Sequence, residues 1–113
     1  MTQNANLVRG TLDLLILKSL SWEPRHGYAV SEWIEQVTDG TVLMEEGTLY
    51  PALHRLAAKG LVESEWGLSE NNRRARYYRL TAEGERYLGS EAAFWKRFTD
   101  SVARALAMEG PTA

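Results

Sequence analysis

The spacing of the apolar residues changes at Gly60, and this change constrains the fold of the 113-residue chain more than any other feature. Before Gly60 the apolar positions recur every three or four residues, which predicts an amphipathic helix with this glycine as its left-handed C-terminal cap. After Gly60 they alternate, which predicts a half-exposed strand. The helical positions are Leu49, Ala52, Leu53 and Leu56. After Gly60, Val62, Ser64 and Trp66 alternate with Leu61, Glu63 and Glu65.

Two further helices are expected before this central unit. Residues 7–20 carry apolar positions nearly all round, which predicts a largely buried helix. Pro24 and the residues just before it end that helix, because proline cannot continue one. Residues 26–38 carry a narrower apolar stripe, which predicts an amphipathic helix. The stripe consists of Val30, Trp33, Ile34 and Val37.

After the central unit, the pattern predicts a hairpin and a last helix. Residues 76–80 form an aromatic-rich second strand, which the polar loop 67–75 joins to the first. Thr81 is suited to cap a final helix. The expected fold is mainly α with a small β-hairpin: a winged helix-turn-helix plus one long C-terminal dimerisation helix. The expected units are residues 1–81 (DNA-binding domain), 82–108 (dimerisation helix) and 109–113 (tail).

The charges are divided unevenly along the chain, although the net charge is only -2. Residues 1–47 hold three basic and seven acidic side chains. Residues 48–79 hold six basic and three acidic side chains, and the remainder is near neutral. A surface that binds phosphates is therefore expected between residues 48 and 79.

The helix before Gly60 and the hairpin after it carry side chains suited to duplex DNA. The candidate contacts are Thr48, Tyr50, Pro51, His54 and Arg55, which we expect to face outward from the helix, and Arg73, Arg74 and Arg76 of the hairpin. Arg55 can bind a phosphate or the acceptor edge of guanine, and Thr48 can meet a phosphate near the helix start. For Tyr50 and Pro51, shaping the helix start remains an equal alternative, and Pro51 requires that the first turn begin just before it. A hairpin arginine can also serve solubility alone, but four arginines within residues 73–79 favour DNA contact.

Residues 47–61, Gly-Thr-Leu-Tyr-Pro-Ala-Leu-His-Arg-Leu-Ala-Ala-Lys-Gly-Leu, resemble the recognition-helix signature of the PadR family of bacterial transcriptional regulators. His26-Gly27-Tyr28, Tyr77-Tyr78-Arg79-Leu80-Thr81 and Gly84 are similar to other landmarks of that family. The resemblance extends over about residues 7–108. It implies the short subgroup, in which a single C-terminal helix forms the dimer. The segment 69–74 departs from the glycine-rich wing of many members, so the resemblance does not define the contacts of the wing.

The last helix carries more large apolar residues than a lone exposed helix can cover. Leu88, Trp95 and Val102 recur every seven residues, and Phe94 and Phe98 stand beside them. This pattern predicts a homodimer through the helix. The family resemblance adds a second role for Trp95, which is to stack on a flat aromatic small-molecule effector between subunits. Filling the dimer core remains the favoured interpretation of Trp95.

The sequence therefore predicts a PadR-like repressor that binds double-stranded DNA at a pseudo-palindromic operator as a homodimer and that an effector releases. The alternative hypothesis is a winged-helix protein-interaction module that does not bind DNA. A gel shift with the DNA upstream of the chain's own coding sequence separates the two hypotheses.

Several classes of function are not expected. The chain has no cysteine, and its two histidines lack metal-ligand spacing, so neither a metal nor another cofactor is predicted. Because phosphate-binding glycine loops and nucleophile motifs are missing, an enzyme is not expected. No run of apolar residues is long enough to cross a membrane, and we expect a cytoplasmic protein.

Overall fold

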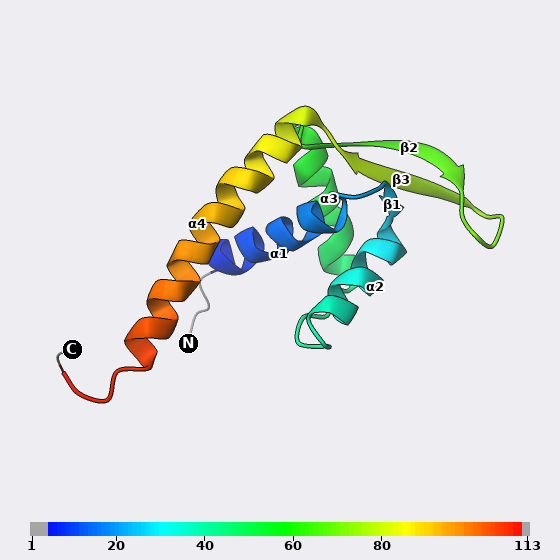
Figure 1. Ribbon diagram of the computed structural model, residues 1–113. Coiled ribbons are helices and arrows are strands. Elements are labelled where there is room, and N and C mark those ends of the chain that lie inside the picture. Colours follow the sequence, from blue (N-terminus) through cyan, green and yellow to red (C-terminus); the bar gives the residue numbers. More distant parts are fainter. Residues whose placement is uncertain (1–4, 112–113) are drawn as a thin grey trace.

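The computed structural model describes residues 5–111, which form four helices and a small sheet (Figure 1). The extreme ends of the expected 1–81 and 109–113 segments lie outside these residues. The elements are α1 (Ala5–Ser19), β1 (Arg25–His26), α2 (Gly27–Val37), α3 (Glu46–Ala58), β2 (Val62–Leu68), β3 (Arg74–Leu80) and α4 (Ala82–Leu106). The fold is the expected mainly helical winged helix, and α4 extends away from it (Figure 1).

The core lies where α1, α2 and α3 meet the base of the hairpin. Its fully buried side chains come from all three helices, so packing of the helices against one another stabilises each of them. The main core residues are Ile16 and Leu17 of α1, Val30 and Ile34 of α2, Leu49, Leu53 and Leu56 of α3, and Val62 and Tyr78 of the sheet. Val37 was expected in this stripe, but it lies at the end of α2 and is exposed.

The end of α3 confirms the cap predicted at Gly60. Gly60 has a φ of +77°, which only glycine adopts without strain. The Leu61 amide donates to the carbonyl of Leu56 at 3.0 Å, and the Gly60 amide donates to that of Ala57 at 3.0 Å. This pair of bonds is the Schellman arrangement, which turns the chain directly from α3 into β2.

The hairpin of β2, loop 69–73 and β3 is called the wing below. Its strands reach further than the sequence pattern indicated, because β3 begins at Arg74 and only five residues connect it to β2. The two-residue β1 pairs antiparallel with β3, which makes the order β1-β3-β2. Apolar periodicity could not reveal β1, because two residues are too short to show a period.

Two expectations about the helix starts have different outcomes. The Thr81 hydroxyl accepts a hydrogen bond from the Gly84 amide at 3.0 Å, which confirms the predicted cap of α4. The expectation that α3 starts just before Pro51 is wrong, because α3 starts at Glu46 and contains Pro51 in its second turn. The proline removes the amide that would have bonded to the carbonyl of Gly47.

The root of α4 is fixed closely to the end of α3. The Thr81 amide donates to the carbonyl of Leu61 at 3.1 Å, and the Thr81 hydroxyl donates to the carbonyl of Gly60 at 2.7 Å. Gly84 is buried against the same loop, and a Cβ there would lie 2.1 Å from the Leu61 carbonyl oxygen. Glycine is therefore required at residue 84. From this joint, α4 is about 37 Å long. It passes α1 and extends beyond it (Figure 1).

Candidate nucleic-acid interface

The exposed side of α3 carries four of the five side chains expected there. Thr48, Tyr50, Pro51 and His54 are exposed, whereas Leu49, Ala52, Leu53 and Leu56 on the opposite side are buried. The helical period places these two sets on opposite faces. This part of the orientation prediction is confirmed, and it leaves a polar helix face open to a partner.

Arg55 does not belong to that exposed set, so the prediction that it faces outward is wrong. Its side chain is half-buried, and Nη2 donates to the Asp13 carboxylate of α1 at 2.7 Å. Asp13 itself is buried, and a buried carboxylate requires a partner. The guanidinium that sequence reasoning assigned to DNA therefore ties α3 to α1 in the structure.

The register of the wing gathers two of the predicted arginines on one face. Trp66 stands directly opposite Arg76, and Leu68 stands opposite Arg74. Alternate residues of a strand share a face, so Trp66, Arg74 and Arg76 project to the same side. The guanidinium carbons of Arg74 and Arg76 lie 4.4 and 5.2 Å from the centre of the Trp66 ring. Arg73 is exposed at the end of the connecting loop.

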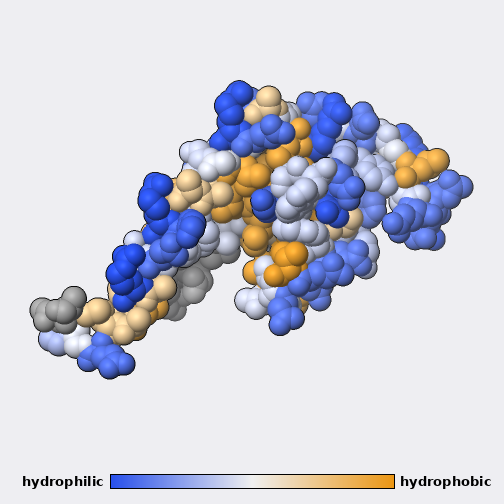
Figure 2. Space-filling model, in the orientation of Figure 1, coloured by the Kyte–Doolittle hydropathy of each residue, from blue (hydrophilic) through white to orange (hydrophobic). Residues whose placement is uncertain are grey.

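The other face of the wing is neutralised by its own carboxylates. Arg79 Nη2 lies 2.8 Å from the Glu63 carboxylate, which is its cross-strand neighbour. The hydrogen bond to Glu63 raises the pKa of Arg79. Two of the six basic residues between 48 and 79 are thus in ion pairs, because Arg55 is paired with Asp13. Figure 2 shows hydrophilic residues over most of the wing.

A groove of about 700 Å³ separates the wing from the starts of α2 and α3. This wing groove is lined by His26 and Tyr28 beside α2, Tyr50 of α3, and Trp66, Arg74 and Arg76 of the wing. It brings Tyr50, Arg74 and Arg76 of the predicted DNA contacts around one space. Thr48, Pro51 and His54 lie on the exposed side of α3 outside this lining.

Tyr50 is the residue of α3 that lines the wing groove. A Cβ on Gly27 would lie 2.5 Å from the Tyr50 hydroxyl, so the glycine makes room for this ring. Partial burial raises the pKa of the Tyr50 phenol, and the charge of Glu46 raises it further. Tyr50 therefore stays neutral, and it both packs against Gly27 of α2 and lines the groove.

His26 acts as a helix cap. Its Nδ1 accepts a hydrogen bond from the Ala29 amide at 3.2 Å, and its ring lies edge-on to Tyr77 at 5.4 Å. His54 is exposed on α3. In residues 5–111 no three metal-ligating side chains come together, and none of the helices is long and apolar enough to span a bilayer.

The far half of α4 exposes a row of aromatic and aliphatic side chains. Phe94 and Phe98 stack at 6.0 Å, and Trp95 packs on Phe98 at 5.8 Å. Phe94, Phe98 and Val102 are all exposed by more than 40% of their surface. Leu88 differs from the other predicted dimer contacts, because it packs against the core of its own chain.

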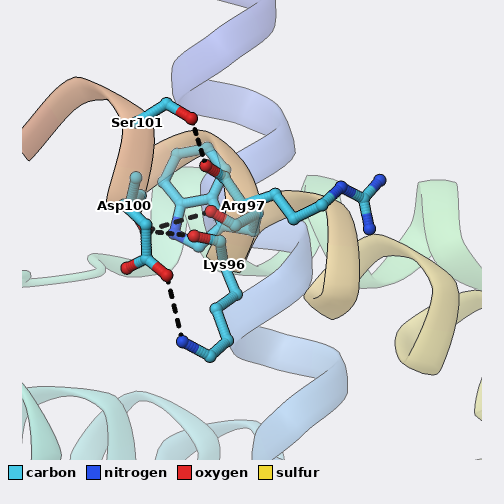
Figure 3. Close-up of polar contacts among 6 residues, drawn as sticks. Lys96, Arg97, Asp100 and Ser101 are labelled. Atoms are coloured by element: carbon cyan, nitrogen blue, oxygen red, sulfur yellow. Dashed lines mark hydrogen bonds and ion pairs between the residues drawn. The ribbon is translucent and has the colours of Figure 1, made fainter. Parts of the chain in front are cut away.

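Local contacts satisfy the polar side of α4. Lys96 Nζ donates to the Asp100 carboxylate at 3.0 Å, and the Ser101 hydroxyl donates to the carbonyl of Arg97 at 2.8 Å (Figure 3). These polar groups need no further partner, whereas Phe94, Phe98 and Val102 remain exposed within residues 5–111. A cavity of about 130 Å³ lies beside this row, between α1 and α4, and its lining includes Leu14, Tyr87 and Trp95.

Comparison with known proteins identifies this arrangement. The model of the transcriptional regulator PadR-like family matches residues 16–90, which include α2, α3 and the wing. The chain belongs to the PadR family. The fold and the family are those of transcriptional regulators that bind DNA through a winged helix-turn-helix.

Solved structures agree with this assignment. A transcriptional regulator from Clostridium thermocellum is 33% identical with a TM-score of 0.77, and the match covers 91% of this chain and 99% of that one. A PadR-family regulator from Eggerthella lenta is 37% identical with a TM-score of 0.73, and the match covers 93% of this chain and 89% of that one. In sequence, protein X of Lysinibacillus sphaericus is 31% identical over 106 residues, which are 94% of this chain and 95% of that protein.

Two residues of this PadR-family site were missed by the sequence reasoning. Asp13 is the one acidic residue of α1 and stands among its leucines, and that position signals a buried partner such as Arg55. Trp66 was expected on the half-exposed face of a strand, but its position beside Arg74 and Arg76 depends on the cross-strand register. Only a correct alignment of the two strands could have revealed this cluster.

Proposed function

We propose that this PadR-family protein is a transcriptional repressor that binds a pseudo-palindromic operator as a homodimer. The observation that carries the proposal is that Tyr50 of α3 and Arg74 and Arg76 of the wing line one groove, while Thr48 and His54 are exposed on α3 outside it. In this proposal the exposed side of α3, with Thr48 and His54, enters the major groove. The arginines of the wing, Arg73, Arg74 and Arg76, bind the neighbouring phosphates. In this proposal Arg55 positions α3 through its ion pair with Asp13 of α1.

The dimer in this proposal forms through α4. The exposed row of Phe94, Phe98 and Val102 is suited to pack against the same row of a second copy, with Trp95 beside it. A two-fold dimer presents two copies of α3 to successive major grooves, about 34 Å apart. Because the target is chromosomal DNA, we propose that the protein acts in the cytoplasm. No catalytic step is part of its action.

Release by an effector is a further part of the proposal. The cavity between α1 and α4 lies beside Trp95, whose indole offers a flat stacking surface. A flat aromatic molecule that favours the dimer geometry unsuited to DNA by about 1–3 kcal/mol would weaken DNA binding about 5- to 150-fold. Filling of the dimer core by Trp95 is the competing role, and equilibrium dialysis of the dimer with planar dyes separates the two.

The test is a gel shift with the DNA upstream of the chain's own coding sequence. We expect a sequence-selective complex that weakens steeply with salt, because each phosphate contact releases counterions. A protein-interaction module would form no such complex. The double variant Arg73→Ala/Arg74→Ala should lower the slope of log affinity against log salt by about 2 units. An unchanged slope would exclude the wing from the DNA contact.

A further inference from the structure

The exposed indole of Trp66 lies beside two arginines of the neighbouring strand that are free of carboxylate partners. Trp66 remains 54% exposed, although tryptophan side chains are on average highly buried in proteins. Arg74 and Arg76 both lie within cation–π distance of its ring, at 4.4 and 5.2 Å. Within residues 5–111, neither arginine forms an ion pair. The exposed tryptophan is therefore in contact with two arginine charges, Arg74 and Arg76, that no carboxylate neutralises.

Several contacts restrict the directions in which these guanidinium groups point. Arg76 Nε also donates to the Ser64 hydroxyl at 3.0 Å, so Arg76 is held on two sides. The face that carries Trp66 and both arginines borders the wing groove opposite Tyr50. Glu32 and Glu70 line the same groove, but neither is within ion-pair distance of these arginines. The geometry keeps two positive charges at defined positions in the groove.

We propose that Trp66 is a positioning residue for DNA binding: its ring holds the Arg74 and Arg76 guanidinium groups ready to bind phosphates of the duplex backbone. The inference rests on the proposed function of the wing. An arginine that is ordered before binding loses less conformational freedom when it meets a phosphate than a mobile one does. Trp66 acts through the arginines, so its effect should disappear when they are removed.

The experiment is a double-mutant cycle on binding to a labelled 30-base-pair duplex of mixed sequence, measured by fluorescence anisotropy at several salt concentrations. Trp66→Leu should weaken binding about 3- to 10-fold in the otherwise natural protein. In the Arg74→Ala/Arg76→Ala background, the same change should weaken binding by less than about 2-fold. Trp66→Phe keeps an aromatic face and should restore most of the affinity.

Two matched variants serve as controls. Arg79→Ala removes a cation from the same strand but from the opposite, carboxylate-paired face. Trp22→Leu removes an exposed tryptophan that lies beside Lys18, away from the wing groove. Both should keep the affinity within about 2-fold of the natural protein, because neither side chain takes part in the proposed phosphate contact.

The outcomes distinguish this inference from the proposed function. If the natural protein does not bind the duplex at low salt, both are overturned. If it binds and Trp66→Leu binds equally well, or loses the same affinity without the arginines, only the role of Trp66 is overturned. A second measurement uses the natural protein and therefore does not depend on the folding of a variant. NMR relaxation of the arginine Nε–H groups should show that Arg74 and Arg76 are more ordered than Arg73. Equal mobility of the three would also overturn the inference.

Discussion

Helices α3 and α4 are built on the same helical period but present opposite kinds of surface. In α3, which has 13 residues, one side is buried in the core and the other exposes polar groups and Tyr50. In α4, which has 25 residues, Gly84 is the one buried residue, and the exposed side carries an aromatic row. Polar atoms in water need no cover, whereas a contiguous aromatic row does.

This difference means that α3 and α4 are suited to different kinds of partner. The apolar side of α3 is covered within the chain, so its outer side is available to a polar ligand. Phe94, Phe98 and Val102 of α4 are exposed in the described chain, so we propose that a protein surface covers them. Substitutions in the two helices test this difference between the outer side of α3 and the apolar row of α4.

The interior of α3 should respond most strongly to truncation. Leu53 is fully buried at the centre of the core. Leu53→Ala removes buried methyl groups and leaves a cavity, so we expect the free energy of unfolding to fall by about 2–5 kcal/mol. Urea denaturation followed by circular dichroism measures this loss. A loss below 1 kcal/mol would contradict the assignment of α3 to the core.

The aromatic row of α4 should respond through association. Phe98→Ala removes a ring that stacks with Phe94 and Trp95. We expect self-association to weaken about 30-fold, which corresponds to roughly 2 kcal/mol, while the helical content changes little. Sedimentation equilibrium measures the change, and Lys96→Ala on the polar side of α4 is the control. A natural protein that stays monomeric at all concentrations would refute the division between the two helices.

The ion pair between α1 and α3 tests whether Arg55 only stabilises the fold or also contacts DNA. Asp13→Asn leaves the shape of the site but removes the charge that the Arg55 guanidinium meets. We expect a loss of about 1–3 kcal/mol in the free energy of unfolding. Chemical denaturation and DNA titration should be carried out together on Asp13→Asn and Arg55→Leu. If only Arg55→Leu loses sequence selectivity, Arg55 contacts DNA in the complex.

The smallest effect is expected at Gly89 in the middle of α4. A Cβ there would meet nothing within 4 Å in the described chain. Gly89→Ala should therefore raise the free energy of unfolding by up to about 1 kcal/mol through helix propensity. Thermal unfolding measures the gain. Weaker self-association of this variant would mean instead that the helix of a second copy passes close to Gly89.

The sequence predicted the elements well where their signal was local. The helical spacing of Leu49, Leu53 and Leu56, the cap at Gly60 and the cap at Thr81 all depend on neighbours within a few residues. For the same reason the winged-helix fold could be predicted before the structure was known. Each of these signals combines a side-chain type with a fixed offset along one element.

The site was less predictable because its contacts join residues far apart in the chain. Asp13 and Arg55 are 42 residues apart, and helix geometry alone predicted that Arg55 faces outward. The cluster around Trp66 depends on the register of two strands, and a shift of one residue would have reversed its face. Arginines close in sequence therefore differ in surroundings: Arg76 faces the groove, and Arg79 faces a carboxylate.

The joint at Gly84 links the reading of DNA to the geometry of assembly. Hydrogen bonds from the Thr81 amide and hydroxyl join it to the carbonyls of Leu61 and Gly60. The end of α3 and the beginning of α4 are therefore held together at one joint. A tilt of about 5° at this joint would move the far end of α4 by roughly 3 Å. In a dimer joined through α4, a displacement of this size would change the distance between the two α3 helices. The close packing at Gly84 would then determine which spacing of the two operator half-sites the dimer fits.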